Sequence, residues 1–176
     1  KTPLRYPGGK SRACTKMGQF FPELREYVEF REPFLGGGSV AIHVSKLYPH
    51  LKITVNDLYE PLINFWMNLQ MFGDELSTNL KNLKIAHPNQ DSARCLFAEM
   101  KDVINDSTQN NLDRAVAFYI VNKCSFSGLT ESSSFSAQAS DSNFSLRGIE
   151  KLPEYSEIIS HWHINSYSYE YCFRTD

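Results

Sequence analysis

The sequence has 176 residues, of which 41% are hydrophobic and 22% are charged, so it describes a folded domain with its own core and excludes disordered and membrane-embedded chains. Lysine and arginine number 18 and aspartate and glutamate 20, for a net charge of −2, which excludes a protein that coats nucleic acid or anionic lipid over its whole surface. The four cysteines lie far apart without a C-x-x-C pair, so we predict no disulfide scaffold and no metal site. We expect a protein with reduced cysteines in the cytoplasm, without membrane association.

The first predicted helix follows a basic N-terminal stretch. Five cations precede the first acidic residue: Lys1, Arg5, Lys10, Arg12 and Lys16. Ser11 is a suitable N-cap, and apolar residues recur after it at roughly helical spacing. We therefore expect a helix from Ser11 that ends or bends at Pro22.

A strand, a glycine turn and a helix come next. Residues 27–34 are rich in β-prone side chains and lead into Gly36-Gly37-Gly38, which favours a strand. Apolar spacing predicts a helix over residues 39–48, then a second strand over 52–56. A strongly apolar helix with Pro61 in its first turn follows. This order of elements is typical of a parallel α/β sheet.

The second half contains helices and a serine-rich segment. We predict helices around residues 96–104 and 112–120, a helix after Pro153 and a short strand at 162–165. Between Ser125 and Ser145, nine of 21 residues are serine, which is typical of a flexible surface loop. Three phenylalanines in the same segment argue against a simple linker, which has no use for apolar rings.

The strongest local signal is a glycine motif between the first strand and its helix. Gly36-Gly37-Gly38-Ser39-Val40-Ala41 fits G-x-G-x-x-A, in which small residues let a ligand approach the backbone. Asp57 lies 21 residues after Gly36, at the end of the second strand, where it can accept bonds from ribose hydroxyls. The alternative is a turn that only tightens a strand-to-helix corner. The pattern indicates a nucleoside-containing cofactor but does not separate NAD from S-adenosylmethionine.

A second signal lies at the N-terminus. Tyr6-Pro7-Gly8-Gly9-Lys10 places an aromatic ring and an ammonium group around a tight turn before a helix. These groups could stack on a base and hold a carboxylate, or form an ordinary capped turn.

Four blocks of the sequence together resemble Dam-type DNA adenine-N6 methyltransferases. They occur in the order expected for that family and cover most of the chain: Tyr6–Lys10, Arg31–Val40, Asn56–Asn64 and Asn122–Thr130. The resemblance implies an α/β fold, with an incomplete Rossmann-like methyltransferase sheet and a helical, loop-rich insertion that recognises DNA. It also implies a bacterial or phage-encoded protein.

The resemblance divides the chain into three parts. Residues 1–70 would bind the cofactor, 71–150 would form the DNA-recognition insertion, and 151–176 would return toward the catalytic strand. The implied cofactor is S-adenosylmethionine. The residues implied to bind it are Tyr6, Gly8, Gly9, Lys10, Glu32, Pro33, Phe34, Gly36, Gly38, Asp57 and Leu58.

Double-stranded DNA is the partner that the resemblance implies. The residues implied to contact it are Arg5, Asn122, Lys123, Ser125, Phe126 and Thr130. The serine-rich segment is then a candidate hairpin that faces DNA, and its hydroxyls suit phosphates and base edges. The basic N-terminal stretch would contribute salt-dependent contacts to the backbone.

The catalytic signature of the family is missing. It is an aspartate or asparagine followed by two prolines and an aromatic residue, and this sequence has no Pro-Pro dipeptide, so no catalytic residue is assigned. We expect an N-terminal portion of a methyltransferase that alone transfers no methyl group, with an exposed apolar edge strand and an uncovered sheet face. A second chain could complete the sheet. An NAD-dependent oxidoreductase and a non-catalytic DNA-binding module are the alternatives.

Overall fold

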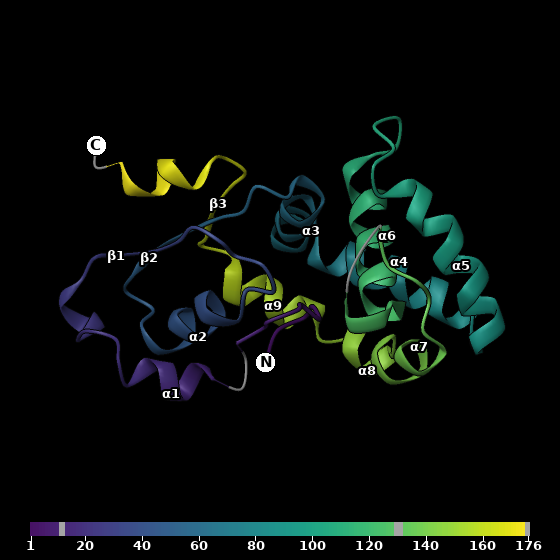
Figure 1. Cartoon of the computed structure of the whole chain (residues 1–176), viewed down its shortest axis with the longest axis horizontal. Coiled ribbons are helices and arrows are strands. Elements are labelled where there is room, and N and C mark those ends of the chain that lie inside the picture. The colour runs from purple at the N-terminus through teal and green to yellow at the C-terminus, as the bar shows by residue number, and fades with distance from the viewer. Residues whose placement is uncertain (11–12, 129–131, 175–176) are drawn as a thin grey trace.

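Three parallel strands form one side of the molecule. A computed structural model describes residues 1–10, 13–128 and 132–174. Strands β1 (Glu29–Glu32), β2 (Lys52–Asn56) and β3 (His163–Asn165) lie in the order β1-β2-β3. Figure 1 shows this sheet with α1 and α2 on one side of the view and a cluster of helices on the other. The predicted parallel α/β sheet is confirmed at this level.

The first two strands are joined through a short helix. Residue 29 pairs with residue 52 and residue 32 with residue 55, and α2 (Ser39–Leu47) lies between the two strands in the chain. Helix α1 (Cys14–Gly18) and the 3₁₀ turn η1 (Leu24–Glu26) precede β1. The crossover brings the ends of β1 and β2 to the same edge of the sheet.

One face of the sheet is packed against an apolar core. Ile53 and Val55 of β2 are fully buried, as is Trp66 of α3 (Glu60–Met71). Trp66 packs on Trp162, which follows helix α9 (Leu152–Ile159) in the chain. The two ring centroids are 5.6 Å apart. The core therefore brings together the beginning and the end of the long helical stretch that connects β2 to β3.

The other face of the sheet is polar. Its side chains come from alternate strand positions: Glu29, Arg31, Lys52, Thr54, Asn56, His163 and Asn165. Arg31 donates to the carbonyls of Cys172 and Arg174 (3.0 and 2.8 Å). These bonds draw η3 (Tyr169–Phe173) toward this face. Alternation of apolar and charged residues therefore makes the face compatible with water.

The remaining helices form a cluster beside the sheet (Figure 1). They are α4 (Gly73–Ala86), α5 (Gln90–Val103), α6 (Asn111–Cys124), α7 (Ala137–Asn143) and α8 (Leu146–Ile149). Helix α6 is central, because eight consecutive residues from 115 to 122 are buried. Phe118 and Tyr119 of α6 stack on Phe65 of α3 (centroids 5.8 and 6.1 Å apart), which joins the cluster to the sheet side.

Part of the serine-rich segment is helical, and the expectation of a flexible surface loop is wrong for residues 137–143, which form α7. Ser136 and Ser145 cap α7 and α8, because their side chains accept bonds from backbone N–H groups in the first turns. Phe144 is fully buried, which agrees with the expectation that a segment with three phenylalanines is not a simple linker. Ser125 and Phe135 form an antiparallel bridge, which gives part of the predicted hairpin.

Several predicted boundaries also change. The first strand covers Glu29–Glu32 instead of 27–34, and Pro33, which lacks an N–H, follows it directly. The first helix begins at Cys14; the predicted cap Ser11 lies outside the described residues. Helix α4 was not expected from the sequence. Within the described ranges, no helix is long and apolar enough to cross a membrane.

Candidate functional site

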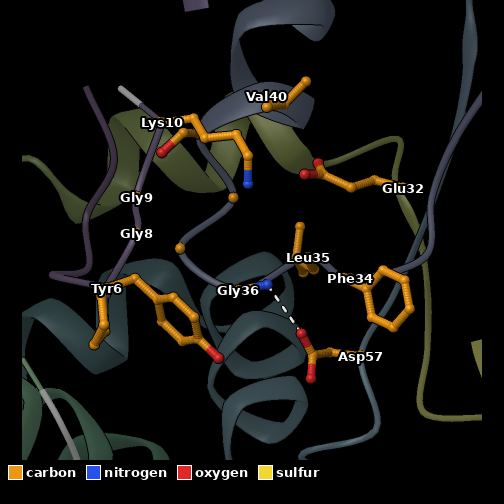
Figure 2. Close-up of a pocket in the computed structure, with 14 residues that line it drawn as sticks. Tyr6, Gly8, Gly9, Lys10, Glu32, Phe34, Leu35, Gly36, Val40 and Asp57 are labelled. Atoms are coloured by element: carbon orange, nitrogen blue, oxygen red, sulfur yellow. Dashed lines mark hydrogen bonds between the residues drawn. The ribbon is translucent and has the colours of Figure 1, made fainter. Parts of the chain in front are cut away.

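A cleft of about 300 Å³ opens where β1 and β2 end (Figure 2). Its lining comes from three segments that are distant in the sequence: the turn Tyr6–Lys10, the run from Phe34 to Val40 with Glu32, and Asp57. The carboxyl ends of parallel strands are the usual place for ligands in open α/β sheets. The volume lies at the lower end of the range for small-molecule sites.

The glycine loop forms the floor of this cleft and leaves no room for side chains. Gly36 and Gly38 have φ of +50° and +68°, a region that costs an L-residue energy. A Cβ on Gly38 would lie 2.7 Å from Cζ2 of Trp66, and one on Gly36 would lie 2.9 Å from the ring of Tyr6. Trp66 also donates its Nε1–H to the Gly36 carbonyl (3.1 Å). The loop is thus held between two aromatic side chains.

Asp57 closes one side of the cleft. Its Oδ2 accepts the backbone N–H of Gly36 (3.0 Å), and its Oδ1 accepts that of Tyr59 (3.1 Å). The neighbouring Asn56 is buried and held by the backbone of Tyr167, with bonds of 2.9 Å in both directions. Each carboxylate oxygen keeps a further lone pair for a ligand. Asp57 is therefore fixed in place and still able to accept hydroxyl groups.

Glu32 provides a second carboxyl group at the end of β1. Its Oε2 accepts the N–H of Ala41 (2.9 Å) in the first turn of α2. Burial raises the pKa of Glu32 to about 7, against the lowering effects of the Ala41 bond and of Lys10, while Asp57 raises it further. A carboxyl group that changes charge near neutral pH thus faces the cleft.

The turn from Tyr6 to Lys10 covers the glycine loop. Gly9 donates to the Tyr6 carbonyl (2.9 Å), and the Tyr6 ring lies against Gly36 and Gly37. Burial, and secondarily Asp57, raises the pKa of Tyr6, so the phenol stays neutral. Figure 2 shows the side chains of Lys10 and Glu32 extending into the same part of the cleft. The described lining of the cleft thus presents the ammonium group of Lys10 and the carboxyl groups of Glu32 and Asp57.

The cleft gathers most of the residues predicted to bind the cofactor. All eleven line it except Pro33 and Leu58. The Pro33 carbonyl instead accepts from Asn56 (3.2 Å), and Leu58 is exposed. Five further residues line the cleft and are not among these eleven, although they lie within the sequence blocks quoted above: Pro7, Leu35, Gly37, Ser39 and Val40. Among the described residues, no cluster of acidic, histidine or cysteine side chains could hold a metal.

The residues predicted to contact DNA divide into exposed and buried groups. Phe126 is 67% exposed, whereas Asn122 and Ser125 are buried. Asn122 bonds to the backbone of Arg5 and Gly128. Burial, and then the nearby Arg5, lowers the pKa of Lys123 to about 8. These bonds give Asn122 a structural role, and its direct contact with DNA stays a prediction. Thr130 lies outside the described residues.

Comparison with known proteins identifies the family of the chain. A family model described as "D12 class N6 adenine-specific DNA methyltransferase" matches residues 6–176. The "DNA N-6-adenine-methyltransferase" of Escherichia phage P1 is 27% identical over 127 residues, which cover 72% of this chain and 15% of that protein. The "Type II methyltransferase M.MjaIII" of Methanocaldococcus jannaschii is 25% identical over 134 residues, which cover 72% of this chain and 46% of that protein.

The chain spans less than half the length of each of these two relatives. The family model, in contrast, covers all but the first five residues of the chain. The resemblance drawn from the four sequence blocks is thereby confirmed, and the chain belongs to the D12 class of N6 adenine-specific DNA methyltransferases.

Proposed function

We propose that the cleft binds S-adenosylmethionine and that the chain serves methylation of adenine N6 in DNA. The observation that carries this proposal is the convergence of Asp57, Glu32 and Lys10 on the glycine loop at the ends of β1 and β2. In this proposal the sheet is part of a Rossmann-like methyltransferase domain built mainly from residues 1–70 and 151–176. The helical part, 71–150, serves DNA recognition.

The chemistry of the lining suits the parts of this cofactor. Asp57 accepts hydrogen bonds from the ribose hydroxyls. Glu32 and Lys10 have opposite charges and suit the ammonium and carboxylate groups of the amino-acid part. The glycine loop allows close approach to the backbone, and Tyr6 and Phe34 offer aromatic faces near the opening. The cofactor supplies the methyl group as part of a sulfonium, and the chain's residues position it.

Double-stranded DNA is the proposed substrate, and positioning is the proposed contribution of this chain to catalysis. Exposed Phe126 and the partly exposed Arg5 lie where the helical cluster meets the N-terminal turn. The sequence contains no proline pair of the family signature, so we assign no residue to the transfer step. We expect the 176 residues alone to leave unmethylated DNA unlabelled by tritiated S-adenosylmethionine. Tritium in DNA above a no-protein control would contradict this expectation.

Two other functions make different demands. An NAD-dependent oxidoreductase would use the same glycines and Asp57. It would leave Lys10 and the hydrogen bonds of the buried Asn122 without a role, and the family match opposes it. A non-catalytic DNA-binding module would bind DNA with an affinity that is indifferent to the cofactor.

Calorimetric titration with S-adenosylhomocysteine, and separately with NADH, tests the proposal. We expect binding of S-adenosylhomocysteine only, and at least about tenfold weaker binding for Asp57→Ala, because hydrogen bonds to a charged group contribute about 1.5–3 kcal/mol. Asp106→Ala is the matched control, because Asp106 also accepts a backbone N–H two residues ahead (2.9 Å from Thr108) but does not line the cleft. Binding of NADH alone would overturn the proposal, and an unchanged affinity of Asp57→Ala would remove Asp57 from the site.

A further inference from the structure

The first residues of the chain connect the cleft to the end of helix α6. We call residues 2–9 the N-terminal bridge. At one end, the Thr2 hydroxyl donates to the Gly37 carbonyl and the Tyr6 ring lies on Gly36 and Gly37. At the other, Arg5 bonds to residues 122–125 of α6 and its C-cap. Figure 1 shows the N-terminus between the sheet and the helical cluster.

Asn122 holds this bridge through a pair of backbone bonds. Its Oδ1 accepts the N–H of Arg5 (2.9 Å), and its Nδ2 donates to the carbonyl of Arg5 (2.7 Å). The same Nδ2 donates to the Gly128 carbonyl (2.8 Å). Asn122 is only 1% exposed, so water does not compete for these bonds. One buried amide thus fixes residue 5 and residue 128 relative to α6.

Segment 122–128 in turn fits around Arg5. The Arg5 guanidinium donates to the Ser125 carbonyl (2.7 Å), just past the end of α6. Gly128 has a φ of +74°, and a Cβ there would lie 2.5 Å from Cβ of Arg5. Residues 5 and 6 are adjacent in the chain, so a shift of segment 122–128 moves Arg5 and the wall that Tyr6 forms over the glycine loop.

We propose that Asn122 is a positioning residue for the cleft, and that it links the order of segment 122–128 to the binding of a ligand beside Tyr6. This inference rests on the proposed function, because the ligand considered is S-adenosylmethionine or its demethylated product. A ligand that holds residues 6–9 in place also holds Arg5 in place. Through Asn122, it then restricts the motion of residues 122–128. Linkage is reciprocal, so a ligand that orders segment 122–128 raises cofactor affinity by the same factor. Segment 122–128 carries the exposed Phe126 proposed to face DNA, which makes DNA the second ligand.

A purely structural role for Asn122 would have different consequences. Loss of a buried amide would then lower the stability of the whole domain and raise amide exchange throughout the core. A positioning role raises exchange locally, in the cleft residues 6–9 and 36–38, and changes ligand affinity at temperatures where the protein is folded.

The chain offers a matched control for the test. Asn64 is also buried and donates its Nδ2 to the Asn111 carbonyl (2.9 Å) at the other end of α6. Asn64→Ala therefore removes a similar bond from the same helix without touching the bridge. Arg5→Met is a milder second variant, because it removes the bond to Ser125 while the backbone bonds to Asn122 remain. It keeps the test decisive if Asn122→Ala does not fold.

Hydrogen–deuterium exchange and calorimetry with S-adenosylhomocysteine measure the linkage. In the unmodified chain, we expect the product to slow amide exchange in 122–128. We expect Asn122→Ala to lose that protection and to bind the product about tenfold more weakly, within the usual 5–150-fold range of coupling between sites. Arg5→Met should show the same changes to a smaller extent, and Asn64→Ala should show neither.

The failure of this inference is distinguishable from failure of the proposed function. If the unmodified chain binds the product but exchange in 122–128 does not change, the linkage is overturned and the cofactor assignment stands. If the unmodified chain does not bind the product, the proposed function fails. The ligand-free comparison then still decides the positioning role, because equal exchange at 6–9 and 36–38 in Asn122→Ala and Asn64→Ala would overturn it.

Discussion

The glycine loop and the serine-rich segment are both built from small residues, but different forces hold them. At Gly36–Gly38 the backbone adopts left-handed conformations and lies against Tyr6 and Trp66, so hydrogen atoms are the only side chains that fit. In residues 125–145, Ser136 and Ser145 use their hydroxyls to cap α7 and α8. Substitution by alanine therefore acts differently in the two regions. In the glycine loop it adds a methyl group that has no room, and at a capping serine it removes a hydroxyl group that accepts a hydrogen bond.

The largest expected effect is that of Gly38→Ala. The positive φ costs about 1–2 kcal/mol, and a Cβ at 2.7 Å from Trp66 adds about 1–3 kcal/mol of overpacking. We expect the free energy of unfolding, measured with urea, to fall by about 2–5 kcal/mol.

Gly8→Ala separates the two contributions. Gly8 also has a positive φ, of +71°, but a Cβ there would meet nothing within 4 Å. We expect a loss of about 1–2 kcal/mol from the backbone conformation alone. Equal losses in the two variants would show that contact with Trp66 contributes nothing at Gly38.

Glu32 provides an intermediate effect, through pH. Its pKa is raised from 4.5 to about 7, so between these values the unfolded chain has released a proton that the folded protein keeps. The free energy of unfolding therefore falls as pH rises through this window and levels off above it, by about 3 kcal/mol in total. We expect Glu32→Gln, which keeps an acceptor for Ala41, to remove this fall.

Urea denaturation at about pH 4 and about pH 8 measures this effect, with each variant compared with the unmodified chain at the same pH. Glu150→Gln is a suitable control because Glu150 lies on the surface, in an exposed pair with Lys81. An identical pH dependence of Glu32→Gln and the unmodified chain would show that the pKa of Glu32 is the same in the folded and the unfolded chain.

The smallest effect is expected in the serine-rich segment. Ser136→Ala removes the side-chain acceptor for the N–H of Ala139 (3.2 Å), and loss of an N-cap costs about 1 kcal/mol. Ser142→Ala, at an exposed position in α7, should change the free energy of unfolding by less than about 0.5 kcal/mol. Thermal denaturation of the two variants tests the comparison, and equal midpoints would remove Ser136 as a cap.

The same contrast explains what could be predicted from the sequence. The glycine loop, Asp57 and the strands around them follow from local rules, because residue type and spacing determine the turn and the place of the carboxylate. Asp57 bonds to Gly36, as expected of residues at the ends of neighbouring strands. Helix α4 was missed although Leu76, Leu80 and Leu83 recur at helical spacing, a signal that was present in the sequence.

The serine-rich segment and the role of Asn122 required the structure. Serine is common in loops and at helix starts, so its frequency does not separate the two, and only the bonds of Ser136 and Ser145 identify caps. Asn122 acts on residue 5, far away in the chain, and no local pattern contains that pairing. Polarity of the open sheet face was readable from the alternation of charged and apolar residues in β1 and β2.

The place of β3 in the chain bears on the order of folding. Every residue that lines the cleft lies between positions 6 and 57, yet β3 pairs Asn165 with Asn56, and Tyr167 holds the Asn56 side chain. Closing so long a loop is slow, because ordering entropy is lost before the contact forms. We expect the helices between β2 and β3 to shorten that search by folding locally first. A chain emerging from the ribosome would then contain all the described lining residues early and would secure β2, the strand that leads to Asp57, among the last.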